Sequence, residues 1–241
     1  MSVTIAFSFA EEGNDQNYIF YKANVLYEKR DYDGALLEYQ ELLDANLTSG
    51  NLYYNMGNCY FKKGEMGKAI LFYERARRLL PRDGDISSNY DYARSLIKET
   101  VLPTQKMWFL RFIDSFFKHF TINELTLLLS FLYLVFFCTL SAMIIFKMEK
   151  RFVIPVLCII LMMASTGLFS LIGKITYEGH GIVVINEKTI ARFEPFERGT
   201  THFTLFEGMK ATIIQSKGMW YKIQREDRRL GWIEKKDVAI I

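Results

Sequence analysis

The strongest hydrophobic pattern along the chain is a pair of long uncharged runs at residues 125–146 and 152–173. Each run is close to the ~20 residues that a helix needs to cross a hydrocarbon core of about 30 Å. Only residues 147–151 separate them, which is enough for a turn. The pattern therefore predicts a two-helix transmembrane hairpin that leaves the chain before it and the chain after it on the same side of one membrane.

Before the hairpin, residues 51–81 follow the spacing of a tetratricopeptide repeat, a unit of 34 residues that folds as two helices. Gly57 and Ala69 are small where the two helices of such a unit approach, and Tyr73 fills the space beside them. Pro81 ends the second helix because it cannot continue the hydrogen-bond ladder. The spacing predicts one complete repeat in this segment.

A weaker copy of the same pattern lies 34 residues earlier, with Ala23, Ala35 and Tyr39 at the matching positions. Residues 86–98 carry apolar residues at helical spacing and predict a helix that caps the last apolar face of the stack. We therefore expect residues 11–101 to form an all-α TPR superhelix of two repeats and a cap.

Tetratricopeptide repeats generally bind extended peptides or partner helices on the face formed by their first helices. The expected groove residues here are Asn24, Asn55, Asn58 and Phe61. Asn24 and Asn55 match the two asparagines of the carboxylate-clamp subclass, which grips a terminal carboxylate. The alternative interpretation is that these asparagines cap or solvate helices.

The basic residues that would complete a carboxylate clamp are missing from this sequence. Phe20, Asp85 and Asn89 stand where lysine or arginine would be needed. The sequence therefore argues against capture of a terminal carboxylate, while leaving other peptide binding open.

Residues 104–121 alternate aromatic and polar side chains at helical spacing, which predicts an amphipathic helix. Aromatic side chains suit the boundary between lipid headgroups and water, so we expect this helix to lie in the plane of the membrane. The alternative is that its apolar face packs on the repeat domain. That face comprises Trp108, Phe109, Phe112, Ile113, Phe116, Phe117 and Phe120.

After residue 174 the pattern changes to short runs of alternating polar and apolar residues separated by turn residues. This pattern predicts a small all-β barrel, closed or half-open, over residues 178–241. The six expected strands are residues 181–185, 189–193, 201–206, 210–215, 220–224 and 231–234.

Composition and charge restrict the functions that the chain can be expected to have. The chain has 30 Lys and Arg against 27 Asp and Glu, and a net charge of +3 does not favour nucleic-acid binding. The three cysteines offer no disulfide framework or metal-ligand spacing, and the three histidines stand apart from one another. Motifs of hydrolases, metalloproteases and phosphate-binding loops are missing, so we predict no enzyme, metal site or cofactor.

The direction of the hairpin follows from its turn, which carries Lys147, Lys150 and Arg151. Short cytoplasmic loops favour basic residues, so the turn is expected in the cytoplasm and both larger domains outside, in the periplasm of a Gram-negative cell. Basic residues that flank the spans, such as Lys118 and Lys174, weaken this inference.

The first ten residues end in a small-x-small pattern at Ser8 and Ala10. We expect residues 1–10 to be the remnant of a signal peptide that begins upstream of Met1. The alternative is an ordinary disordered start.

The C-terminal strands resemble a bacterial SH3 domain. The resemblance rests on residues 191–195 (ARFEP), 205–211 (LFEGMKA), 218–223 (GMWYKI) and 230–233 (LGWI). Such domains bind peptides or cell-wall material, which implies a ligand surface at Trp220, Tyr221 and Trp232. The alternative is that the two tryptophans belong to the core.

The order of repeat, hairpin and SH3-like domain resembles the BatE proteins of the Bacteroides aerotolerance operon. The resemblance implies a scaffold in a cell-envelope complex of the bacterial inner membrane, connected with oxidative stress. It also implies protein partners: other Bat proteins, von Willebrand factor A-domain proteins and a MoxR-type ATPase, beside membrane lipid. A second hypothesis is an adaptor that binds peptidoglycan and recruits a wall-remodelling enzyme. In both, the fold class is a multidomain membrane protein.

Overall fold

The computed structural model describes residues 2–97 and 107–241, with the side chains of residues 2–14, 110, 114 and 178 left out. The chain divides into two compact units. The first combines Met1–Pro103 with Gly181–Ile241, and the second is Thr104–His180. The N-terminal helices and the C-terminal strands therefore belong to one unit, although the second unit interrupts them in the sequence.

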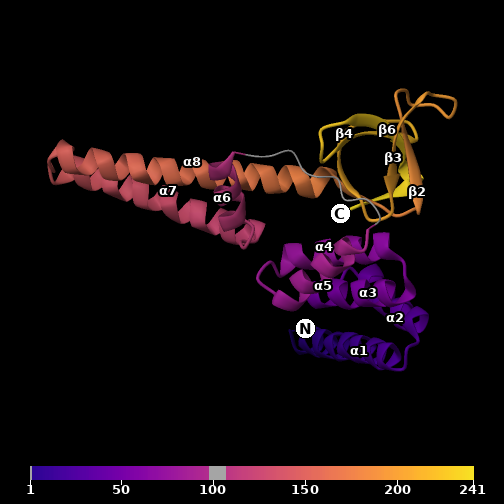
Figure 1. Ribbon diagram of the computed structural model, residues 1–241. Coiled ribbons are helices and arrows are strands. Elements are labelled where there is room, and N and C mark those ends of the chain that lie inside the picture. The colour runs from indigo at the N-terminus through magenta and orange to yellow at the C-terminus, as the bar shows by residue number, and fades with distance from the viewer. Residues whose placement is uncertain (1, 98–106) are drawn as a thin grey trace. The chain divides into compact units, whose positions relative to one another are not determined.

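The N-terminal part of the first unit is a stack of antiparallel helices, as predicted (Figure 1). Helix α3 shows how the helix ends are determined. At its start the Ser49 hydroxyl accepts a hydrogen bond from the Leu52 amide at 3.1 Å, and at its end Gly64 adopts a φ of 80°. The helices are α1 (Ser2–Glu28), α2 (Tyr32–Asp44), α3 (Gly50–Lys63), α4 (Met66–Leu79) and α5 (Gly84–Ser95).

Close packing inside each helix pair follows the small residues that the repeat pattern singled out. A Cβ atom at Gly57 would lie only 2.6 Å from the ring of Tyr73, so only glycine lets α3 and α4 come this close. In the weaker copy, Ala23, Ala35 and Tyr39 are buried at the matching positions of α1 and α2. The expected signal-peptide remnant within α1 stays a prediction.

The C-terminal part of the first unit is a curved antiparallel sheet of seven strands in the order β3-β2-β6-β5-β4-β1-β7. All six expected strands are present, and β7 is added to them. The edge strands β3 and β7 do not pair with each other, so the sheet is unclosed, as in an SH3-like or other small β domain. The strands are β1 (Gly181–Val184), β2 (Lys188–Arg192), β3 (Thr201–Phe206), β4 (Lys210–Lys217), β5 (Trp220–Arg225), β6 (Leu230–Glu234) and β7 (Val238–Ile240).

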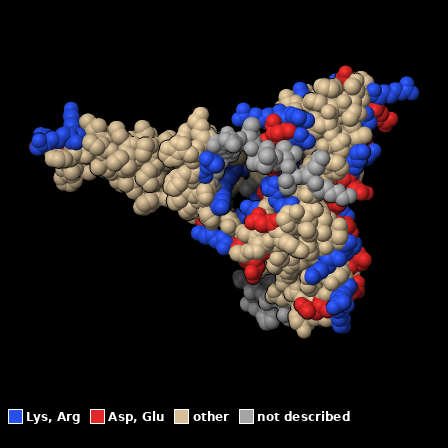
Figure 2. Space-filling view, in the orientation of Figure 1, with Lys and Arg blue, Asp and Glu red and all other residues tan. Residues whose placement is uncertain are grey.

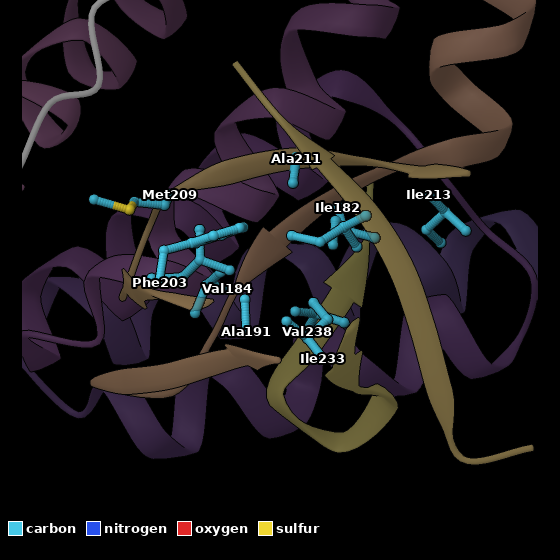
Figure 3. Close-up of a cluster of buried hydrophobic side chains, with 11 residues drawn as sticks. Ile182, Val184, Ala191, Phe203, Met209, Ala211, Ile213, Ile233 and Val238 are labelled. Atoms are coloured by element: carbon cyan, nitrogen blue, oxygen red, sulfur yellow. The ribbon is translucent and has the colours of Figure 1, made fainter. Parts of the chain in front are cut away.

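Figure 3 shows the core of this sheet, where aliphatic side chains from several strands lie together, with Phe203 and Met209 at one side. Alternation along the strands delivers these residues to one face, which is the physical reason for the period-two pattern in the sequence. Tyr221 and Ile97, which follows α5, pack against the same core. The buried members are Ile182, Val184, Ala191, Phe203, Leu205, Met209, Ala211, Ile213, Ile223, Ile233 and Val238.

The second unit contains α6 (Trp108–Phe117) and two long helices, α7 (Ile122–Ile145) and α8 (Lys150–His180). Both long helices are apolar enough and long enough to cross a membrane, and their apolar windows are 0% and 17% buried. Gly167 of α8 lies against Leu129 of α7, where a Cβ would come within 3.0 Å of the leucine side chain. The two helices therefore form the expected hairpin.

The ends of the hairpin extend beyond the uncharged runs. Helix α7 begins at Ile122 because Thr121 and Glu124 form a reciprocal capping box, and α8 continues to His180, so that β1 follows it directly. Figure 2 shows that Lys and Arg gather at the end of the hairpin that holds the α7–α8 turn, while other residues cover most of its length.

Helix α6 is shorter than the expected amphipathic segment, and residues 104–106 lie outside the described residues. Its aromatic side chains at Trp108, Phe112 and Phe116 are exposed. The boundary expected at residue 101, between the repeats and this helix, also lies outside the described residues.

Candidate partner-binding site

The candidate groove residues lie on the first helices of the repeats, where two of the asparagines bond to each other. Asn24 on α1 accepts two hydrogen bonds at its Oδ1 atom. The donors are the hydroxyl of Tyr39 at 2.6 Å and the Nδ2 atom of Asn55 on α3 at 3.0 Å. One tyrosine and two asparagines thus join three helices.

The same arrangement recurs 34 residues later, the length of one repeat. The Oδ1 atom of Asn58 accepts from the Tyr73 hydroxyl at 2.7 Å and from Nδ2 of Asn89 on α5 at 3.1 Å. Nδ2 of Asn89 also donates to the Tyr54 hydroxyl at 2.8 Å. We call Asn24, Asn55, Asn58 and Asn89, with Tyr39 and Tyr73, the asparagine ladder.

Burial determines which groups of the ladder donate hydrogen bonds and which accept them. Desolvation raises the pKa of both Tyr39 and Tyr73, so the two phenols stay protonated and donate. The Oδ1 atoms of Asn24 and Asn58 are therefore occupied within the fold. The bonded asparagines join neighbouring helices, and their part in binding a ligand stays a prediction.

An aromatic pair lies beside the ladder. Phe61 on α3 and Tyr92 on α5 have ring centroids 5.7 Å apart, and Tyr92 is 58% exposed. The sequence pointed to Phe61 but missed Tyr92, although Tyr92 is one repeat length after Asn58. With the four ladder asparagines, this pair defines what we call the first-helix face, on α1, α3 and α5.

The aromatic residues proposed for a ligand surface on the sheet are largely part of its packing. Trp232 is only 9% exposed, and Tyr221 packs against the core cluster, with Lys235 Nζ 4.8 Å from its ring centre. Trp220 is half-buried and pairs with Glu234 across the sheet. For Trp232 this agrees with the core alternative.

The packing of the sheet on α4 was not predicted from the sequence. The Gly67 amide near the start of α4 donates to Glu207 Oε1 at 2.7 Å. A Cβ at Gly67 would lie 2.5 Å from the Val184 carbonyl oxygen, and one at Gly208 would lie 2.7 Å from the side chain of Ile70. Two glycines, one on each side, therefore permit the contact. We call it the sheet–helix interface.

A buried carboxylate lies at the same interface. Glu74 on α4 is 8% exposed, with Lys210 of β4 at 3.2 Å and Arg77 at 3.7 Å. Burial alone would raise the pKa of Glu74, but the two cations outweigh it and hold this pKa below its ordinary value. Burial, with Glu74 nearby, raises the pKa of Tyr90 on α5 to about 12. Its ring lies 4.2 Å from the Arg77 guanidinium.

Arginines of α4 also cover the edge of the sheet. Arg75 donates to the Ile240 carbonyl at 2.7 Å and Arg78 to the Ile241 carbonyl at 2.8 Å. Edge strands with open hydrogen-bonding groups invite pairing with other chains. Helix α4 therefore protects the β7 edge as well as supporting the sheet.

Comparisons with known proteins agree with the helical repeats. The family model for the tetratricopeptide repeat matches residues 50–83, which confirms the repeat predicted at residues 51–81. This repeat is a non-catalytic fold whose general role is protein–protein interaction. No curated protein matches the chain. Among the described residues, no three His, Cys, Asp or Glu side chains are grouped so that they could hold a metal ion.

Proposed function

We propose that this protein is a membrane-anchored scaffold that binds partner proteins on the first-helix face and on its C-terminal sheet, within a bacterial cell-envelope complex. The observation that carries the proposal is the tetratricopeptide repeat at residues 50–83, a protein-interaction fold joined to two helices able to cross a membrane.

The position of the sheet–helix interface supports binding on the first-helix face. The sheet contacts α4 at Gly67, Glu74 and Arg75 and α5 at Arg94, and none of these residues belongs to the first-helix face. A partner on the first-helix face and the sheet on α4 can therefore be present together.

The same interface supports a hairpin topology. Residues before α7 and residues after α8 contact each other directly in the first unit, for example at Gly67 and Glu207. A single membrane span, or three, between them would separate these residues by a membrane, whereas two spans return the chain to the side from which it came. The basic turn at 147–151 then favours the external side for the repeats and the sheet.

The cellular process is the most specific part of the proposal. The resemblance to BatE proteins supports aerotolerance, with von Willebrand factor A-domain proteins and a MoxR-type ATPase as partners. The exposed aromatic side chains of α6 support contact with lipid at the membrane surface. Because Trp232 is part of the sheet's packing, we do not advance the peptidoglycan-binding alternative.

Site-specific photocrosslinking tests the first-helix face. A photoreactive amino acid at Phe61 in the full chain, in native membranes, is expected to crosslink one dominant protein. Placing it at Leu37 on α2, which is 73% exposed and lies on a second helix rather than on the first-helix face, provides the matched control. The segment of the partner that is crosslinked, synthesised as a peptide, should bind the purified full chain. Its affinity for the Tyr92→Ala variant should be at least tenfold lower. Equal crosslinking from both positions would argue against the proposal.

Cysteine labelling tests the topology. A Met148→Cys variant with Cys138 and Cys158 replaced by alanine should resist an impermeant maleimide in intact spheroplasts and react after lysis. Cys59 can stay, because it is buried and burial raises the pKa of its thiol to about 12. In the same background, Met219→Cys in the exposed β4–β5 turn should react in intact spheroplasts. The reverse pattern would place the turn outside.

A further inference from the structure

We infer that the C-terminal sheet fixes the position of α5 and thereby shapes the first-helix face, so that sheet docking and partner binding are thermodynamically coupled. The inference rests on the proposed function only in treating the first-helix face as a binding surface. Its structural half, the dependence of α5 on the sheet, can be measured without any partner.

On both α4 and α5, one residue belongs to the asparagine ladder and the next residue belongs to the sheet–helix interface. On α4, Tyr73 donates to ladder residue Asn58, and the next residue, Glu74, pairs with Lys210 of the sheet. On α5, Asn89 joins the ladder, and the next residue, Tyr90, lies at the sheet–helix interface, with Lys210 Nζ 5.7 Å from its ring centre. A shift of either helix at the interface must therefore move a ladder residue.

Helix α5 contacts the sheet as well as the repeats. It is the last helix of the stack, and it buries Ile86, Tyr90 and Ala93. The sheet contacts its C-terminal end at two points. Arg94 lies 3.7 Å from Glu226, and Ile97, just beyond the helix, packs against the sheet core and Gly208. The sheet thus caps the face that a further repeat would cover in a longer array.

Coupling follows from this geometry. The ladder bond between Asn89 and Asn58 and the Phe61–Tyr92 pair both require α5 to stay in place beside α3. A partner that contacts α3 and α5 together binds the docked state better than an undocked one, so it must also stabilise the docked sheet. Partner binding on the first-helix face is in this way linked to docking of the sheet at the sheet–helix interface.

Hydrogen exchange on the full chain in nanodiscs, with no partner added, tests the inference. The Gly67→Ala variant places a Cβ against the Val184 carbonyl at the interface. Since alanine favours helix over glycine, any loosening of α5 cannot come from a weaker α4. We expect the amides of residues 84–95 to exchange at least tenfold faster. The matched control is Gly84→Ala, where a Cβ would have nothing within 4 Å and exchange should not accelerate.

A second variant guards against general misfolding. Glu207→Ala removes the acceptor of the Gly67 amide without adding bulk, and it should accelerate exchange in α5 several-fold while leaving α1 and α2 unchanged. Glu197→Ala, in an exposed loop, is its control. Unchanged α5 exchange in both interface variants would overturn the inference. Accelerated exchange together with failed crosslinking at Phe61 would instead overturn the proposed function alone.

Discussion

Replacing Lys210 with methionine is expected to lower the free energy of opening of α4 and α5 by about 3 kcal/mol at pH 7. The change removes the nearest cation from Glu74, a carboxylate that is 8% exposed, and leaves it with Arg77 at 3.7 Å. Removing one partner of a buried ion pair costs more than the pair contributes, because the carboxylate has lost its water and Arg77 alone does not fully replace it. Hydrogen exchange of the α4 amides in the full chain measures the loss.

The pH dependence of this loss of stability is a second, independent test of the Glu74–Lys210 ion pair. In the native protein the pKa of Glu74 is held below its ordinary 4.5, so its contribution to stability is present above that pH and is lost as the pH falls further. Without Lys210, burial is expected to dominate and raise this pKa. The variant then loses stability as the pH rises through the raised value. The difference between native and variant should therefore shrink from pH 7 toward pH 4.

Lys236→Met is the matched control for this experiment. Lys236 pairs with Glu234 at 2.6 Å within the C-terminal domain, but its side chain is 70% exposed. Water replaces such a partner readily, so we expect no measurable change in α4 exchange. A Lys210→Met variant that behaved like this control, or whose deficit did not depend on pH, would contradict the buried ion pair.

The Gly57→Ala variant is expected to destabilise the helical stack by about 1–3 kcal/mol. At an unconstrained position in a helix, the same change stabilises by about 0.5–1 kcal/mol, since glycine loses more backbone entropy on folding. Here the added Cβ would lie 2.6 Å from the Tyr73 ring, so α3 and α4 must separate. Denaturant unfolding of the full chain in detergent, followed by exchange in α3 and α4, measures the effect.

Separation of α3 and α4 would also reach the ladder, because Tyr73 donates to Asn58. Exchange at α3 should therefore increase more than exchange at α7 in the second unit. Gly84→Ala serves again as the control with open space around the new Cβ. Stabilisation by Gly57→Ala would mean that the two helices do not pack through this glycine.

Most of the correct predictions about the fold came from residues that recur at regular spacing in the sequence. The 34-residue offset located Gly57, Ala69 and Tyr73 in one helix pair, and the same offset located Ala23 in the other. These patterns are readable because helix contacts within one repeat are local in sequence. Alternation located six of the seven strands, and β7, only three residues long, was too short to carry a pattern of its own.

The candidate site was less predictable. The sequence selected Asn24, Asn55 and Asn58 by family position but could not say which atoms they would bind. Tyrosines 15 residues away and asparagines 31 residues away bond to Oδ1 of Asn24 and Asn58, and Nδ2 of Asn55 donates to Asn24. Phe61 was selected without its partner Tyr92. Although Tyr92 lies one repeat length after Asn58, that offset does not show that the two rings meet.

By itself, the sequence determined the helical repeat, the strand-rich C-terminus and the apolar hairpin, because each depends on a period of hydrophobic residues along a continuous segment. Only the tertiary structure decided that the repeats and the sheet form one unit. Glu74 and Lys210 are 136 residues apart, and Gly67 and Glu207 are 140. Such contacts depend on complementary surfaces, in which two glycines make room and one buried carboxylate meets its cation. No periodic pattern encodes that complementarity.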